Sequence, residues 1–303
     1  MSARTRLLAA FAAVYVIWGS TYLAIRFTVE TLPPFLMAGV RFVVAGALLY
    51  GFLRWRGVGK PTRTQWGAAA VVGALLLLGG NGAVVWAALR VPSGLIALLV
   101  ATEPLWVVLV DWARPAGAAP RPGEALGLML GLAGVGVLLV PADLIGGVFE
   151  IDLFGAALVV FAAVSWAIGS VYSRHAPTHP SPFLATGMKM LTGGALLLVA
   201  GTMSGEWARV VWSEISLKSL LALIYLIVFG ALIGFTAYIW LLQNTTLPRA
   251  STYAYVNPVI AVLLGWLFAA EPMTPRIVVA SAVIVASVVI VVRSRAQQLE
   301  SGA

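Results

Sequence analysis

The stretch that decides the fold is Phe35-Leu-Met-Ala-Gly-Val-Arg-Phe-Val-Val-Ala-Gly-Ala-Leu-Leu49, because it returns 148 residues later as Phe183-Leu-Ala-Thr-Gly-Met-Lys-Met-Leu-Thr-Gly-Gly-Ala-Leu-Leu197. The two copies are identical at seven of fifteen positions, and Arg41 of the first aligns with Lys189 of the second. A match of this kind indicates an internal repeat, which must be identified before any other feature of the fold.

Further matches extend the repeat in both directions. Gly19-Ser-Thr-Tyr22 aligns with Gly169-Ser-Val-Tyr172, and three bulky or rigid residues recur at one spacing of 154, namely Trp86 with Trp240, Pro104 with Pro258 and Trp112 with Trp266. Ala, Leu and Val matches alone would be chance in this composition, but coincident Gly, Pro and Trp are not. The sequence therefore predicts a duplicated chain.

The composition identifies the environment of both copies. Of the 303 residues, 61% are apolar and 10% are charged, whereas a soluble domain has about 45–50% apolar and about 25% charged residues. A chain this apolar is predicted to be an integral membrane protein, which excludes a cytosolic enzyme, a nucleic-acid binder and a disordered scaffold. The absence of cysteine excludes disulfides, thiol nucleophiles and thiolate metal sites.

Apolar runs of about 20 residues, the length needed to cross the bilayer as a helix, occur ten times. The predicted spans are Leu7–Phe27, Pro34–Leu53, Trp66–Ala88, Ser93–Val110, Glu124–Val140, Leu153–Ser173, Phe183–Thr202, Ser219–Gln243, Ala250–Ala269 and Arg276–Val292. We expect an all-α integral membrane fold of ten transmembrane helices.

Orientation follows from the basic residues in the connections. With the N-terminus inside, the inner set has twelve members: Arg4, Arg6, Arg54, Arg56, Lys60, Arg63, Arg114, Arg121, Arg174, Arg249, Arg293 and Arg295. The outer set has five: Arg26, Arg90, Arg209, Lys218 and Arg276. This bias obeys the positive-inside rule and predicts that both termini lie inside. The acids lean outward: Glu30, Asp143, Glu150, Asp152, Glu206, Glu214 and Glu271.

Ten spans divided between two copies give five spans each. Because five is odd, the second copy enters the membrane from the opposite side, which gives an inverted repeat around an axis in the membrane plane. We assign residues 1–142 to the first repeat and 143–303 to the second. Such symmetry is typical of carriers that alternate between inward and outward openings around a site near the bilayer midplane.

Several motifs resemble those of one family. They are Trp18-Gly-Ser-Thr-Tyr-Leu-Ala-Ile-Arg26, Gly80-Asn-Gly82, Val91-Pro-Ser-Gly94, Ala101-Thr-Glu-Pro-Leu-Trp106, Ser251-Thr-Tyr-Ala-Tyr-Val-Asn-Pro258 and Glu271. Over nearly the whole chain the sequence resembles the EamA branch of the drug/metabolite transporter superfamily, with YddG- and YedA-type amino-acid and metabolite exporters as the nearest subgroup. The resemblance implies two EamA repeats and export of small metabolites across a bacterial inner membrane. One departure is that Glu271 follows the ninth span, whereas the matching position of the first half falls near Arg114.

Glu103 is the first candidate for a transport residue. It lies about ten residues into its span, hence close to mid-bilayer, where a charged side chain costs about 2.5–3.5 kcal/mol on insertion scales. One interpretation is that it binds a cationic amine or a proton. The other is that it pairs with a neighbouring helix or with backbone freed by Pro104.

Arg41 and Lys189 are treated as structural or coupling charges. Each lies about two turns into its span, at equivalent places of the two repeats. They are interpreted either as receptors for a substrate carboxylate or as a structural ion pair or a side chain reaching the interface. We favour the structural interpretation, because duplication alone gives symmetric placement. Glu103 is a candidate partner for Arg41.

Aromatic and amide side chains are predicted to line a mostly uncharged cavity around the substrate. With Glu103, the substrate-binding candidates are Trp18, Ser20, Tyr22, Asn81, Trp166, Ser170, Tyr238, Asn244, Tyr253 and Asn257. Trp18 and Trp166 are displaced by two residues relative to the matching glycines, so they need not face the same way. The alternative is an interfacial aromatic belt, which suits Trp55, Trp66, Trp112, Trp207 and Trp212.

Small residues at Gly127 and Gly131, and at Ala282 and Ala286, suit close helix packing within the chain or in a homodimer. Internal packing is the favoured interpretation of both pairs.

An enzyme is disfavoured, since both histidines, His175 and His179, lie in one loop and no phosphate-binding loop or metal-ligand spacing is present. We expect no cofactor and no metal. A channel would need a continuous pore ringed by charge or carbonyls, and the inverted pair suits alternating access better. The function expected is export of amino acids, aromatic or neutral and with broad selectivity, by a monomer or homodimer in the bilayer. Other small solutes, namely drug-like compounds, sugars or nucleotides, are the alternative.

Overall fold

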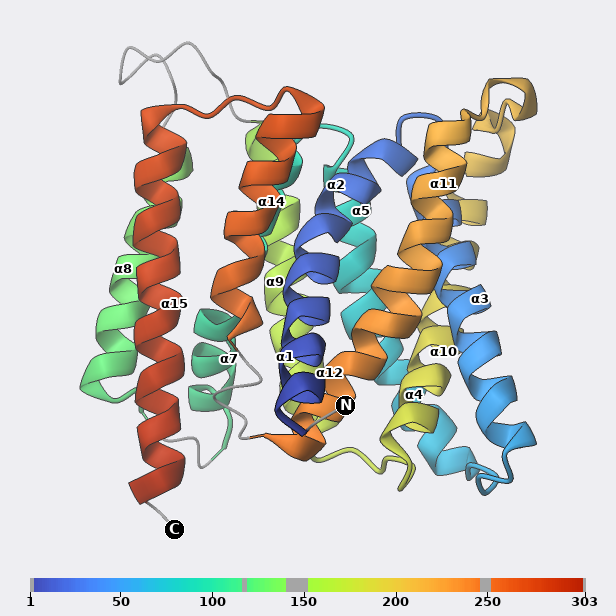
Figure 1. Cartoon of the computed structure of the whole chain (residues 1–303), viewed down its shortest axis with the longest axis horizontal. Coiled ribbons are helices and arrows are strands. Elements are labelled where there is room, and N and C mark those ends of the chain that lie inside the picture. The colour runs from blue at the N-terminus through green and yellow to red at the C-terminus, as the bar shows by residue number, and fades with distance from the viewer. Residues whose placement is uncertain (1–2, 116–118, 140–151, 246–251, 302–303) are drawn as a thin grey trace.

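The structure is a computed structural model that describes residues 3–115, 119–139, 152–245 and 252–301 (Figure 1). These residues form helices and connections, without a strand among them. Within them, nine helices are long and apolar enough to cross a membrane, and the shorter apolar helix Tyr253–Ala269 supplies a tenth segment. The all-α membrane fold is thereby confirmed. The predicted boundary between residues 142 and 143 lies outside the described residues and stays a prediction.

The helices follow the predicted spans with ends that differ by a few residues. In the first half they are α1 (Ala3–Ala13), η1 (Val14–Trp18), α2 (Gly19–Thr28), α3 (Pro34–Trp55), α4 (Arg63–Gly73), η2 (Ala74–Gly82), α5 (Ala83–Ala87), α6 (Ser93–Val100), α7 (Glu103–Trp112) and α8 (Pro122–Leu139). In the second half they are α9 (Leu153–Ser173), α10 (Pro182–Met203), η4 (Glu206–Arg209), η5 (Trp212–Glu214), α11 (Leu217–Tyr225), η6 (Leu226–Ile233), α12 (Gly234–Asn244), α14 (Tyr253–Ala269) and α15 (Pro275–Ser301).

Both described ends of the chain lie at the same end of the molecule, as an even number of spans requires (Figure 1). Following the distribution of basic residues, we call this the inner end and the opposite one the outer end.

The fourth span differs from its prediction, because it is two helices instead of one. The helix α6 ends at Val100, two residues form a turn, and α7 begins at Glu103. Pro104 accounts for the break, since it has no N–H to donate to the Val100 carbonyl and its ring crowds that carbonyl. The counterpart Pro258 is accommodated inside α14.

Three other spans contain a π-helical segment, in which the backbone bonds widen. These are η1 in the first span, η2 in the third and η6 in the eighth. The third and eighth spans are equivalents in the repeat, and η2 packs on α10 as η6 packs on α3. Segments of this kind occur frequently at functional sites, and no pattern in the sequence predicts a π-helix at these places.

The repeated stretch forms the contact between the two halves. The helix α3 packs along α10, and four glycines at equivalent positions allow the backbones to approach. A Cβ on Gly46 would lie 2.9 Å from the amide nitrogen of Leu191 and 3.0 Å from the carbonyl oxygen of Gly187. A Cβ on Gly194 would lie 2.8 Å from the nitrogen of Val43 and 3.1 Å from the carbonyl oxygen of Gly39.

A second contact between equivalent helices joins α8 to α15 at one edge of the molecule (Figure 1). Gly127 and Gly131 of α8 face this contact, since a Cβ on either would meet Ser287 of α15. This agrees with internal packing of that pair. Ala282 and Ala286 are exposed on α15.

Carboxylates at the outer end cap helices that run inward from it. Glu206, which is 2% exposed, accepts the N–H groups of Phe35 (3.3 Å) and Leu36 (2.9 Å) at the start of α3. Glu271 accepts those of Ser93 (2.6 Å) and Gly94 (2.9 Å) at the start of α6. A carboxylate is favoured there because the first amides of a helix lack intrahelical partners.

Asp152 does the same for α9, where its Oδ1 accepts the N–H of Gly155 at 2.8 Å. That N–H, helped by the guanidinium of Arg90, holds the pKa of the Asp152 carboxyl below its usual value. Helix capping therefore explains part of the outward bias of acids in the sequence.

Replacing Glu206 with alanine is expected to lower the free energy of unfolding by about 1.5–3 kcal/mol, because two buried amides at the start of α3 lose a charged acceptor. The measurement is thermal or denaturant unfolding of the detergent-purified protein. The control is Glu214→Ala, an exposed acid in the same connection, for which little change is expected. Equal stability of the two variants would contradict the capping role.

Candidate functional site

Trp18 is the centre of an aromatic cluster at the junction of η1 and α2. Its ring centroid lies 5.2 Å from that of Phe235, 5.1 Å from that of Tyr238 and 5.1 Å from that of Tyr253. The two tyrosine rings are 5.3 Å apart and their side chains hydrogen-bond to each other. The indole Nε1 donates to the carbonyl oxygen of Gly230 in η6 at 3.2 Å. We call Trp18, Phe235, Tyr238 and Tyr253 the aromatic cluster.

Glu103 lies within electrostatic range of this cluster. As the first residue of α7, it stands at the break in the fourth span, and it is half-buried. Its carboxylate interacts electrostatically with the phenol groups of Tyr22, Tyr238 and Tyr253. The structure thus brings an acid and four aromatic side chains from the first, fourth, eighth and ninth spans to one region.

Asn257 of α14 is the repeat counterpart of Glu103. Asn257 directly precedes Pro258, as Glu103 directly precedes Pro104. It is 6% exposed, and its carbonyl oxygen lies 3.3 Å from the place of a Cβ on Gly19 of α2. No described group within reach donates to its Oδ1. The equivalent residues of the two repeats therefore present a carboxylate on one side and an amide on the other.

Trp166 belongs to a second, equivalent contact between α9 and η2. Asn81 lies in η2, where its Oδ1 is buried without a donor among the described residues. The ring of Trp166 lies 2.9 Å from the place of a Cβ on Gly80, as Trp18 lies against Gly230. Both tryptophans thus face a glycine of a π-helical segment from the other repeat, despite the displacement in sequence. In this contact Ser165 donates to the carbonyl of Leu75 at 2.7 Å.

The remaining candidates lie apart from the aromatic cluster. Ser20 shares a 2.6 Å hydrogen bond with the hydroxyl of Tyr225. Ser170 lies in α9, the helix that packs on η2. Asn244 is exposed at the inner end of α12 and donates to the carbonyl of Trp240 at 2.9 Å.

The two intramembrane cations have different surroundings. Arg41 is 4% exposed and its Nη2 lies 3.2 Å from the place of a Cβ on Gly230. Lys189 is only half-buried. In the described part of the chain Arg41 forms no ion pair with Glu103, the partner considered from the sequence.

Sequence reasoning missed Thr21, Tyr225 and Gly230, which lie around Arg41 or Ser20. A single glycine or threonine in an apolar run does not indicate a binding site by itself. No sequence pattern marks the π-helical segment that brings Gly230 toward Trp18. The tryptophans assigned to an aromatic belt are mostly exposed: Trp55 (79%), Trp112 (50%), Trp207 (51%) and Trp212 (75%).

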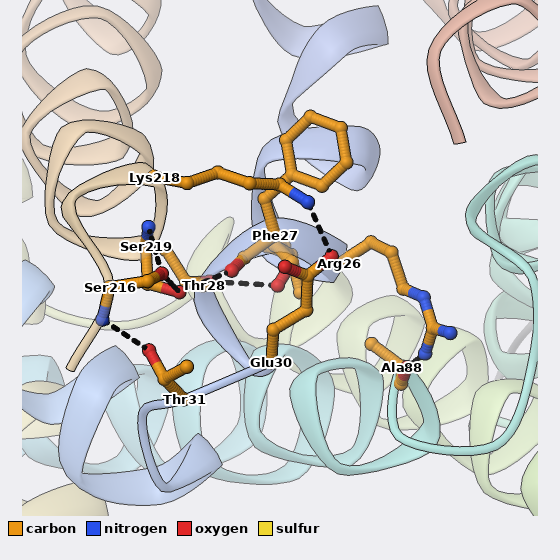
Figure 2. Close-up of polar contacts among 10 residues, drawn as sticks. Arg26, Phe27, Thr28, Glu30, Thr31, Ala88, Ser216, Lys218 and Ser219 are labelled. Atoms are coloured by element: carbon orange, nitrogen blue, oxygen red, sulfur yellow. Dashed lines mark hydrogen bonds and ion pairs between the residues drawn. The ribbon is translucent and has the colours of Figure 1, made fainter. Parts of the chain in front are cut away.

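The outer end of α2 is tied to the second half by polar contacts (Figure 2). Lys218 Nζ lies 2.7 Å from a carboxylate oxygen of Glu30 and 4.0 Å from the ring centroid of Phe27. Ser219 Oγ donates to the carbonyl of Phe27 at 2.7 Å, and Arg26 donates to that of Ala88 at 2.8 Å. We call the Glu30–Lys218 pair and the Ser219 bond the outer contact.

The inner end has an equivalent contact between the third span and the connection after the sixth. Gln65 Nε2 donates to the carbonyl of Thr178 at 3.2 Å. Gln65 also forms a capping box with Thr62, as Ser219 bonds to Ser216 in the outer contact. The inner contact is neutral, whereas the outer one contains an ion pair.

Comparison with known proteins identifies the family of the chain. The model of the EamA-like transporter family matches residues 5–140 and again residues 153–293. The chain belongs to the EamA-like transporter family. Two successive matches to one family model confirm the internal repeat that the sequence predicted.

Relatives of the EamA chain include transporters of several organisms. It is 41% identical to YedA of Escherichia coli (strain K12), an uncharacterized inner membrane transporter, over 94% of this chain and 90% of that protein. It is 26% identical to the uncharacterized transporter YvbV of Bacillus subtilis (strain 168), over 97% and 94%. A solved crystal structure at 24% identity superposes with a TM-score of 0.64 over 95% of this chain and 97% of that one, which shows a shared fold.

Proposed function

We propose that this EamA protein exports amino acids across a bacterial inner membrane by alternating access, with the aromatic cluster and Glu103 as part of the substrate site. The observation that carries the proposal is the aromatic cluster in mid-span, with Glu103 at the break of the fourth span within electrostatic range of Tyr238 and Tyr253. The relative YedA of Escherichia coli is an inner membrane transporter, which supports the location.

The chemistry of the cluster suits an ammonium group. A carboxylate supplies the countercharge, and the faces of Trp and Tyr rings attract cations, with about 0.5–2 kcal/mol for each favourable contact. The same rings can stack on an aromatic substrate, which favours aromatic and neutral amino acids. Nucleotide or phosphate-ester substrates would need several basic side chains, and the spans offer Arg41 and Lys189.

The break at Glu103 supports the use of this region as a binding site. Transporters commonly bind substrate where a membrane helix is interrupted near the midplane, because the half-helix ends present unpaired backbone groups and a dipole. The equivalence of Trp18 with Trp166, each against a glycine of the other repeat, gives the two halves matching contacts to exchange during alternation.

The test is uptake of labelled amino acids into proteoliposomes, with and without a pH gradient. The panel contains aromatic, aliphatic, cationic and acidic members, and empty liposomes are the baseline. We expect uptake above baseline, largest for aromatic and neutral members. No uptake of any member by folded protein would contradict the amino-acid assignment and would favour sugars, nucleotides or drug-like compounds as substrates.

A further inference from the structure

Arg41 is a buried cation that has no counterion among the described residues. Arg41 lies in the outer half of α3 and is 4% exposed. In the described part of the chain, neither its Nε nor its Nη1 has a hydrogen-bond partner. The ion pairs among the same residues involve Arg90, Arg114, Arg174 and Lys218, not Arg41.

This situation is costly, because arginine stays protonated in proteins and cannot relieve the charge by losing its proton. Each buried donor left without a partner costs about 1–3 kcal/mol, and more for charged groups. A structural cation would be expected to have a carboxylate or several carbonyl groups around it. Among the described residues, Cζ of Arg41 lies 4.7 Å from the ring centroid of Phe42, but Nε and Nη1 have no acceptor, and the carboxylate of a bound ligand would supply one.

Duplication alone does not account for Arg41. Its repeat counterpart Lys189 is half-buried, and the sequence equivalence predicts that the two would have similar surroundings. Arginine also differs from lysine in presenting a planar fork of N–H groups that matches the two oxygens of a carboxylate. The buried position therefore carries the residue type suited to a carboxylate.

The neighbours of Arg41 pack closely on the guanidinium and connect it to the aromatic cluster. A Cβ on Gly230 would lie 3.2 Å from Nη2 and 3.1 Å from the methyl group of Thr21, so glycine there lets the guanidinium lie against η6. The carbonyl of the same Gly230 accepts the indole N–H of Trp18. Arg41 and the aromatic cluster thus meet at one residue of η6.

From these contacts we infer that Arg41 is an anion-binding residue that receives the carboxylate of the transported substrate, beside Thr21 and Gly230. This inference rests on the proposed function and deepens it. The substrates selected would be carboxylates with an apolar or aromatic body, in preference to the corresponding amides or amines.

The test measures ligand binding separately from transport, by thermal stabilisation of the detergent-purified protein. The probes are L-phenylalanine, phenylacetate and phenylacetamide, of which only the first two carry a carboxylate. We expect the two carboxylates to stabilise the parent protein. Phenylacetamide should need at least about a tenfold higher concentration for the same stabilisation, because it loses a charge-assisted hydrogen bond. In Arg41→Gln this preference should vanish, and in Arg41→Lys it should be partly restored.

The matched control is Lys189→Gln, which removes the equivalent cation and should keep the preference. The unliganded stability of Arg41→Gln gives a further readout. A structural cation would lower the melting temperature when removed, whereas an uncompensated one should leave it unchanged or raise it. Failure of phenylacetate to stabilise the parent, or an unchanged preference in Arg41→Gln, would overturn the inference. Binding of phenylacetate without uptake of any amino acid would instead contradict the proposed function and leave Arg41 as an anion site.

Discussion

Gly46→Val is expected to cost about 3 kcal/mol or more of the free energy of unfolding. A Cβ at this position would lie within 3.0 Å of backbone atoms of Leu191 and Gly187, which belong to the opposite helix and cannot rotate away. Overpacking of a tight core typically costs about 1–3 kcal/mol of stability. A collision with backbone atoms should cost about 3 kcal/mol or more, because the backbone cannot change rotamer to make room. The helices α3 and α10 would have to separate along their shared length.

The measurement is the melting temperature and the monodisperse fraction of the variant in detergent. Gly51→Val is the matched control, because Gly51 lies in the same helix and a Cβ there would meet nothing within 4 Å. The comparison removes the effect of valine on helix propensity. The close contact is disproved as a stability determinant if both variants melt alike.

Glu103→Gln is expected to reduce transport of ammonium-bearing substrates by at least about tenfold, because the amide keeps the shape of the side chain and loses its charge. If substrate exchanges with a proton, the effect of a pH gradient should disappear as well. The folded protein should keep its melting temperature, since a neutral side chain is cheaper to bury in the membrane than a carboxylate. Uptake into proteoliposomes, together with unfolding of the same preparations, measures both.

Glu124→Gln is the appropriate comparison. Glu124 is also buried, at 6% exposure, and it accepts the N–H of Arg121 near the inner start of α8. Its replacement should leave substrate selectivity unchanged. Full transport by Glu103→Gln would exclude a role for this carboxylate in binding or coupling, while an unfolded Glu103→Gln would assign it a structural role.

Most of the fold was predictable because membrane spans are long apolar runs and the repeat was still legible. The stretch Phe35–Leu49 and its copy Phe183–Leu197 pack against each other around the axis of the repeat. Gly39 and Gly46 meet Gly194 and Gly187 there, so a larger side chain in either copy collides with the other. Such a contact restricts both copies at once, which explains why the repeat was clearest there.

The candidate site was predictable only in part. Glu103 and Trp18 stood out because charge and large aromatic rings are costly or specific in a membrane. Their proximity to Tyr238 and Tyr253 depends on how four spans pack, and a sequence read one span at a time does not contain it. The surroundings of Arg41 likewise depend on a π-helical turn in η6, which changes the direction of side chains after it.

The outer contact makes the outer end of the molecule sensitive to salt. Glu30 and Lys218 are 38% and 50% exposed, so ions in the outer solution screen their attraction, whose range is about 8 Å at physiological ionic strength. At the inner end the hydrogen bond from Gln65 to Thr178 is neutral, but Asp111 forms exposed ion pairs there with Arg114 and Arg174. Raising the ionic strength outside the cell is therefore expected to weaken the outer contact, because the Glu30–Lys218 pair is accessible to ions of the outer solution.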